Sequence, residues 1–335
     1  MGLIKNLAEI KAVLPGMISN LSDISQLANF DYIESKYIIP IIGQTLYDTL
    51  VANYDADTLD PDETILVKKL QLPIVAHAMR EKSGFLTLVI SNSGVKNLQP
   101  GGTDRVYGWQ LQELKTTLIT YANEGTNVFL DYLFTNKALF PEWTSSDQYA
   151  KIASLLIRTG SEFNDNYTLF QPQRSYFIMR NLMTDVQELF IEASIGKELL
   201  VYLRDKVAPD TNETEGIRLL KKAISFFTIF KSCQHFSVQF ADLGFTILGD
   251  KNDNRFENDA DRKNDIKLLE MKMDECEREG NSFLEKARSV LVANYTSVTV
   301  TAEYKTAFDA GPLSGYVNRS ERTSGNEERN FFVMP

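Results

Sequence analysis

The sequence predicts a mainly α protein: two tandem, similar helical-bundle domains with short β segments, and an extended C-terminal tail. Three observations predict this fold: helical spacing of apolar residues through most of the chain, a segment that recurs 153 residues later, and a final stretch without apolar periodicity. The expected domains span residues 1–150 and 151–305, and the tail spans residues 306–335. At 335 residues, the chain is long for one domain and sufficient for two of about 150 residues.

The recurrence is clearest between YIIPIIGQTLYDTL, residues 37–50, and FIEASIGKELLVYL, residues 190–203. Between Ile38 and Lys69, ten of 32 positions match the residue 153 positions further on, without a gap. The identical positions are Ile38, Ile42, Gly43, Leu46, Leu50, Asp57, Thr58, Leu66, Lys68 and Lys69. This period exceeds the repeat unit of a solenoid and indicates a duplicated domain.

Each copy is expected to start with helices that break at a glycine. Pro40 removes a backbone donor and Gly43 permits a reversal of the chain, which predicts a break there. In the second copy Ala193 replaces the proline, whereas Gly196 is kept. Gly43 and Gly196 are therefore predicted to carry the shared turn.

The rest of each copy follows one order of elements. A polar loop leads to a helix with twin lysines, at residues 68–69 and 221–222. Alternating apolar residues in LTLVISNSGV and FSVQFADLGF then predict short strands, and they align Gly94 with Gly244 as structural turns. Long helices are expected from about Trp109 to Leu133 and from about Asp265 to Val292, each with a Glu-Gly pair.

The C-terminal part differs from both copies. NYTSVTVTAEYKTAF, residues 294–308, is rich in β-branched residues and predicts a strand. Residues 309–335 are too polar to fold alone, yet they end in four consecutive apolar residues. Phe331, Phe332, Val333 and Met334 are therefore predicted to dock into a groove on a partner.

The charge and the cysteine content exclude several classes of protein. The net charge is −10 and no cluster of Lys and Arg is present, so the chain is not expected to grip nucleic acid. An acidic surface would suit a wall past which DNA slides. Two cysteines without a paired framework suit a reducing compartment. Neither a signal peptide nor an apolar run long enough for a membrane span is recognised, so no membrane association is expected.

No motif predicts a catalytic, cofactor or metal site. In the calcium-like loop 250–261, Arg255 stands where glycine is needed and Asp261 where a bidentate Glu is needed. A zinc site would have to combine Cys233 and His235 with Cys276 or His77, which lack zinc spacing and are more readily explained as buried residues. Nucleophile and phosphate-binding motifs are absent, and the carboxylates lie at spacings typical of solvated helix faces. We therefore expect no cofactor and no enzymatic activity.

Several segments together resemble a family of uncharacterised proteins from phages and prophages of gut Bacteroidetes, over roughly residues 1–305. They are IIPIIGQTLYDTL, ISNSGV, GWQLQELKTTLITYANEGTNVFLDYL, FPEWTSSDQY and LIRTGSEFN. The resemblance implies a virion component, with a head–tail connector or adaptor as the expected role, and it supplies no catalytic residues.

Such a connector is expected to form a homo-oligomeric ring between the portal and tail proteins, with DNA passing through the lumen without specific binding. It would be found in the virion and, during assembly, in the host cytoplasm. Two alternatives are a cytosolic helical adaptor that binds a host protein and an enzyme of unrecognised type.

Overall fold

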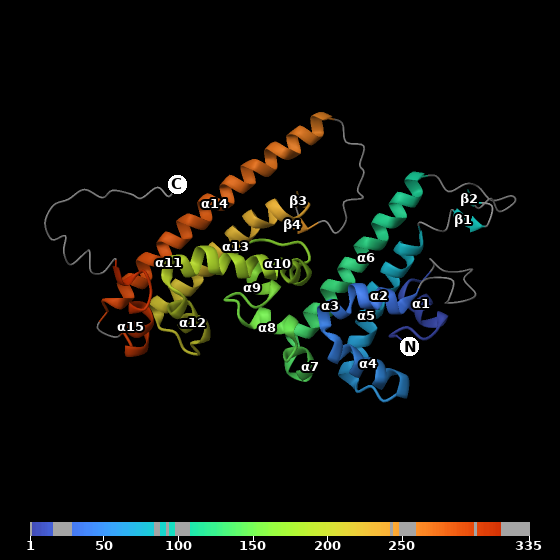
Figure 1. Cartoon of the computed structure of the whole chain (residues 1–335), viewed down its shortest axis with the longest axis horizontal. Helices are drawn as coiled ribbons and strands as arrows, with labels where there is room; N and C mark the ends of the chain where they lie inside the picture. The colour runs from blue at the N-terminus through green and yellow to red at the C-terminus, as the bar shows by residue number, and fades with distance from the viewer. Residues whose placement is uncertain are drawn as a thin grey trace. The chain divides into compact units, whose positions relative to one another are not determined.

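The computed structural model describes residues 2–15, 29–83, 88–91, 94–97, 108–241, 244–247, 259–297 and 300–315. The described chain is mainly helical and divides into two compact units (Figure 1). Unit 1 comprises Met1–Ser154, Thr159–Ser161 and Phe170–Phe177, and unit 2 comprises Leu155–Arg158, Glu162–Leu169 and Ile178–Pro335. Within the described residues, no helix has the length and apolar character that crossing a membrane requires.

Unit 1 contains short helices and one pair of long helices. The short helices are α1 (Leu7–Val13), α2 (Phe30–Tyr37), α3 (Ile39–Ile42), α4 (Gln44–Ala56), η2 (Lys137–Leu139), α7 (Pro141–Thr144) and α8 (Asp147–Ala153). The long pair is α5 (Pro61–Ser83) and α6 (Gly108–Thr135), and the hairpin of β1 (Leu88–Ser91) and β2 (Gly94–Asn97) lies between them in the chain.

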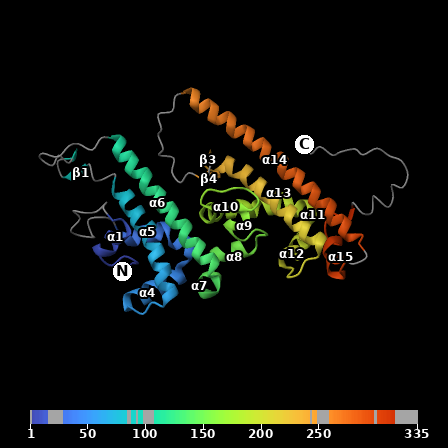
Figure 2. The same ribbon diagram turned by 180° about the vertical axis from the view of Figure 1, so that it is seen from behind.

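Unit 2 repeats this arrangement. Helices α9 (Gly160–Asn164) and α10 (Pro172–Val186) begin in unit 1 and end in unit 2. They are followed by η3 (Gln187–Glu192), α11 (Ala193–Ile195), α12 (Lys197–Asp205) and α13 (Thr211–His235). The hairpin of β3 (Val238–Ala241) and β4 (Gly244–Ile247) precedes α14 (Asp259–Tyr295) and α15 (Ala302–Asp309). Figures 1 and 2 both show α14 lying beside α13, as α6 lies beside α5. The predicted fold of tandem, similar helical domains with short β segments is confirmed.

The β hairpins are equivalent in the two copies. Ser91 pairs with Gly94 in the first hairpin, and Ala241 pairs with Gly244 in the second. Gly94 and Gly244, which the sequence aligns as turn residues, therefore each begin the second strand of their hairpin.

The two predicted glycine turns are also equivalent. Gly43 separates α3 from α4 at φ 84° and ψ 155°, and Gly196 separates α11 from α12 at φ 92° and ψ 147°. Only glycine adopts this region of backbone space without a large cost. Pro40 lies in the first turn of α3, where its missing N–H costs nothing, so the glycine and not the proline carries the shared geometry.

A second pair of glycines sets how closely the long helices approach. A Cβ on Gly125 would lie 2.7 Å from Pro73 Cδ, and a Cβ on Gly280 would lie 2.8 Å from Phe227 Cε1. These are the glycines of the two Glu-Gly pairs. Each lets the second long helix of its unit pack directly on the first.

The strand predicted at residues 294–308 is wrong. Helix α14 continues to Tyr295, and α15 covers Ala302–Asp309. Thr301 caps α15 by accepting a hydrogen bond from the N–H of Tyr304 at 3.3 Å. Tyr304 and Phe308, four residues apart, are fully buried, so helical spacing outweighs β propensity in this segment.

Candidate docking surface

The long helices of unit 2 differ in length, and the excess lies at one end. Helix α14 has 37 residues and α13 has 25, a difference of about 18 Å of helix. Asn212, at the start of α13, donates to Asn294, near the end of α14, at 3.2 Å. Because the helices are antiparallel, this contact leaves the N-terminal third of α14 beyond the end of α13 (Figure 1).

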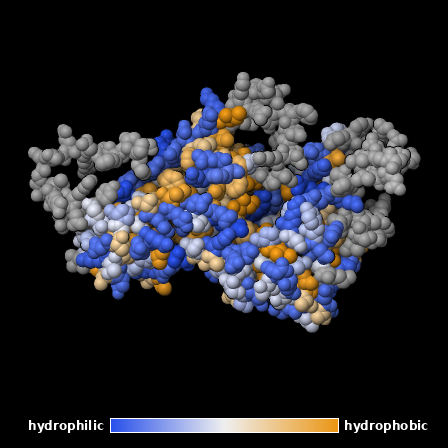
Figure 3. All heavy atoms as spheres, in the orientation of Figure 1, coloured by the Kyte–Doolittle hydropathy of each residue, from blue (hydrophilic) through white to orange (hydrophobic). Residues whose placement is uncertain are grey.

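This free part of α14 exposes large apolar side chains. Ile266 is 50% exposed, Leu268 44% and Met271 61%. Figure 3 shows apolar residues gathered along α14 among the charged ones. In unit 1 the first turn of α6 similarly exposes Trp109, at 64%. Leu268 and Met271 are three residues apart and therefore lie on the same side of the helix, and we call these two residues the free face of α14.

A cavity of about 380 Å³ lies next to this face of unit 2. It is lined by Asn166, Tyr167, Thr168, Phe240, Gly244, Phe245 and Lys272. Lys272 lies four residues after Leu268, on the same side of α14, so the cavity borders the free face along that helix. The rings of Phe240 and Phe245 lie 5.4 Å apart and give the cavity an aromatic side.

Gly244 has a further role in building the cavity. The N–H of Phe245 donates to the carbonyl of Thr168 at 3.1 Å, which holds residues 166–169 against the hairpin. Gly244 has φ 114°, and a Cβ there would lie 2.8 Å from the Thr168 oxygen. Only glycine therefore allows this segment and the hairpin to meet. The sequence predicted the turn but not this contact.

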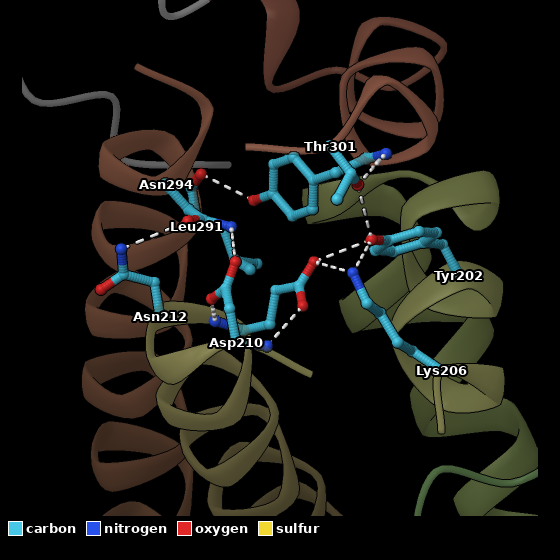
Figure 4. A network of polar contacts seen from close by, with 9 residues as sticks. Tyr202, Lys206, Asp210, Asn212, Leu291, Asn294 and Thr301 are labelled. Atoms are coloured by element: carbon cyan, nitrogen blue, oxygen red, sulfur yellow. Dashed lines mark hydrogen bonds and ion pairs between the residues drawn. The ribbon is translucent and has the colours of Figure 1, made fainter. Parts of the chain in front are cut away.

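At the C-terminal end of α14, away from the cavity, a polar network joins α12, the start of α13 and α15 (Figure 4). Its centre is Glu213, whose side chain is 1% exposed. Glu213 Oε1 accepts from Lys206 Nζ at 2.8 Å and from the Tyr202 hydroxyl at 2.8 Å. Burial alone would lower the pKa of Lys206, but its bonds to Glu213 and Tyr202 outweigh burial and raise that pKa. Lys206 therefore stays charged.

The same network ties α15 to the helices around it. Asp210 and Glu213 form a capping box at the start of α13, with both N–H donations at 2.8 Å. The Tyr202 hydroxyl lies 3.1 Å from Thr301 Oγ1, and the Tyr304 hydroxyl donates to the Leu291 carbonyl at 2.7 Å. The chain thus enters residues 316–335 from a fixed point near the C-terminal end of α14.

Unit 1 carries a simpler version of this network. Asp60 and Glu63 form a capping box at the start of α5, at 2.7 and 3.0 Å. Asn53 Nδ2 donates to Glu63 Oε1 at 2.8 Å. Asn53 aligns with Lys206 at the step of 153, so an amide in the first copy replaces the cation of the second.

Unit 1 also has a smaller cavity, of about 220 Å³, lined in part by Lys69, Asn127 and Asp131. Asn127 Oδ1 accepts from the N–H of Gln173 at 2.9 Å, and Asp131 Oδ1 accepts from Gln173 Nε2 at 3.1 Å. Its polar groups are thus already bonded within the unit.

The residues considered for a zinc site do not form one within the part of the chain that the structure describes. His77 lies in unit 1, whereas Cys233 and Cys276 are buried in unit 2. Burial raises the pKa of Cys276 to about 11 and that of Cys233 to about 12, so both remain thiols at neutral pH. Among the described residues, no group of three or more His, Cys, Asp or Glu could hold a metal ion. Most of the loop 250–261 and the predicted docking residues Phe331, Phe332, Val333 and Met334 lie outside the described residues.

These features define a duplicated protein of paired long helices, with apolar residues exposed at the free helix ends. The chain belongs to the family of unknown function DUF6712, which matches it twice, over residues 38–153 and 184–307. The two matches correspond to the two copies found in the sequence. No curated protein and no solved structure matches the chain.

Proposed function

We propose that the protein is a structural subunit of a phage virion, a head–tail connector or adaptor whose copies form a ring between portal and tail proteins. The observation that carries this proposal is the exposure of apolar side chains on the free helix ends. Trp109 and Met271, the most exposed of these, are each more than 60% exposed in the single chain. Large apolar side chains exposed at helix ends are the residues that protein–protein contacts would cover.

Two further features support the proposal. The resemblance of the sequence to phage proteins points to a virion component. The net charge of −10 suits a channel wall that repels DNA phosphates and lets DNA pass.

The mass of the purified protein tests the proposal, measured by native mass spectrometry alone and after coexpression with the portal and tail proteins of the same virion. We expect a closed ring of copies, alone or with these partners. Trp109→Ser combined with Met271→Ser should weaken the ring. Val207→Ser is the matched control. Val207 is 99% exposed but lies between α12 and α13, not at the N-terminal part of α6 or α14.

Two outcomes would overturn the proposal. A chain that stays monomeric with and without the virion proteins is not a connector. A monomer that instead captures one host protein would favour the alternative of a cytosolic adaptor.

A further inference from the structure

We infer that the cavity beside the β3–β4 hairpin, with the free face of α14, binds the apolar segment Phe331–Met334 of a neighbouring copy. This inference rests on the proposed assembly and names the contact that joins one copy to the next. The acceptor is built from described residues of unit 2. The donor is a named segment outside the described residues.

The chemistry of the acceptor fits two phenylalanines followed by Val and Met. Phe240 and Tyr167 offer partly exposed rings, which aromatic side chains favour, whereas Phe245 is 1% exposed and supports the ring of Phe240 from within. Met271 adds an adaptable thioether on the adjoining helix. A volume of about 380 Å³ lies within the range of pockets that bind small ligands, so it can hold part of a short peptide.

The charges around the two partners are mixed. Lys267 and Lys272 lie close to Leu268 and Met271 in the sequence of α14, and Lys272 pairs with Glu275 at 2.8 Å. Glu327 and Glu328 lie three to five residues before the two phenylalanines. Residues 316–335 carry three Arg and three Glu, so the segment approaches a strongly acidic chain without net repulsion.

The length of the connecting segment favours a neighbour over the same chain. Gly315 follows α15, which is held near the end of α14, and Phe331 lies 16 residues further on. From Tyr295 back to Met271, α14 extends about 36 Å. For comparison, a random coil of 16 residues would have a root-mean-square span of about 22 Å, and a fully extended chain of that length would span about 55 Å. If Phe331–Met334 bound the α14 of the same chain, the 16 residues after Gly315 would therefore have to span more than the random-coil distance.

The placement of donor and acceptor also suits a repeating contact. The described chain ends after α15, at one end of α14, whereas the acceptor lies near β3–β4, towards the other end (Figure 1). A contact between two different surfaces repeats from head to tail and closes into a ring when the rotation permits.

Peptide binding tests the acceptor independently of ring formation. A fluorescent peptide of residues 325–335 is titrated into the full chain carrying Phe331→Ser and Phe332→Ser, with fluorescence anisotropy as the readout. We expect saturable binding that weakens at least tenfold when Leu268→Glu and Met271→Glu are added. Both positions are exposed, so these changes leave the fold intact, and Val207→Glu is the matched control. Equal binding to all three proteins would overturn the inference.

A mixing experiment tests whether the donor comes from another copy. One full chain carries Phe331→Ser and Phe332→Ser, and the other carries Leu268→Glu and Met271→Glu. Each alone should lose assembly, whereas the mixture should form one-to-one pairs in native mass spectrometry, because one intact donor meets one intact acceptor.

The remaining outcomes of this experiment also decide between explanations. Peptide binding without pairing in the mixture would assign the contact to the same chain and overturn the inference. Failure of the unmodified chain to assemble, with peptide binding retained, would count against the proposed function but not against the acceptor.

Discussion

Gly43 and Gly196 share one backbone conformation but have different neighbours. A Cβ on Gly43 would meet Ser146 Cβ at 3.2 Å, whereas a Cβ on Gly196 would lie 2.8 Å from the Gly311 Cα. In the first copy a side chain lies against the turn. In the second copy the backbone that follows α15 does so, and a backbone cannot move aside as easily.

We therefore expect Gly196→Ala to destabilise more than Gly43→Ala. The strained backbone alone costs about 1–3 kcal/mol at each position, and the clash with Gly311 adds to the cost at Gly196. Urea denaturation measures the free energy of unfolding. Gly315→Ala is the control, because a Cβ there meets no described atom within 4 Å, and it should change stability by less than about 0.5 kcal/mol. Equal losses at both turns would contradict the role assigned to Gly311.

His77 is a buried, uncharged histidine. Its ring stacks on that of Tyr37 at 3.7 Å, and its Nδ1 has no hydrogen-bond partner among the described residues. Burial, and then the positive charges of Arg80 and Arg174, lower the pKa of His77 to about 3. Glu81 opposes this shift only weakly.

The lowered pKa predicts a pH dependence. Above pH 6.5 His77 is neutral in both folded and unfolded chains, so it contributes no pH dependence. Between pH 6.5 and 3 only the unfolded chain takes up the proton, and stability falls by about 1.4 kcal/mol per pH unit.

His77→Phe keeps a stacking ring but removes the imidazole that takes up a proton in the unfolded chain. The free energy of unfolding of this variant should therefore fall less steeply than that of the unmodified chain between pH 6.5 and 4.5. The chain's other histidine, His235, is exposed, and His235→Gln serves as the control. Parallel curves for His77→Phe and the unmodified chain would rule out the buried neutral state.

At the scale of elements, the two capping boxes show how the copies diverged. Aligned at the step of 153, α13 begins three residues, nearly one turn, before α5. Identical residues consequently have different roles, because Asp210 caps the start of α13 while its partner Asp57 ends α4 in the left-handed conformation. Sequence identity located the duplication but not this shift, which depends on where each capping box forms.

The divergence predicts different costs for one substitution. Glu213→Gln would place an amide N–H₂ or a weaker acceptor against Lys206 and leave that cation without its counter-charge. Loss of one partner of a buried pair costs about 3–5 kcal/mol, and partial exposure of Lys206 at 19% places the expected loss near the lower figure. Glu63→Gln faces the amide of Asn53, which can reverse and accept, so it should cost less than about 1 kcal/mol. Thermal and urea unfolding of both variants measure the difference, and equal costs would contradict the distinction.

The sequence predicted most elements because their signals are local. Apolar spacing located the long helices, and alternation located the hairpins. The free face of α14 was not predicted, since Leu268 and Met271 have ordinary helical spacing and their exposure depends on where α13 ends. The cavity depends on the contact between Gly244 and Thr168, which joins segments far apart in the chain, and no local pattern encodes it.

At the scale of the whole molecule, the duplication yields two compact units with the same order of elements. The units differ at their free ends, where the first exposes a tryptophan and the second exposes aliphatic side chains and methionine beside an aromatic cavity. Each unit therefore offers neighbours a distinct surface, although both derive from one pattern. Such asymmetry suits a subunit that must contact several different partners.

The length of α14 has a consequence for how such an assembly could vary. The helix separates the point where the C-terminal segment departs from the surface that would receive a neighbour's segment. Each added residue would lengthen that spacing by about 1.5 Å and also turn the receiving face by about 100° around the helix axis. Only insertions close to whole turns, such as seven residues, would keep the face directed as before. Changes in the spacing between copies are therefore restricted to a few discrete steps, and α14 fixes both a distance and a direction.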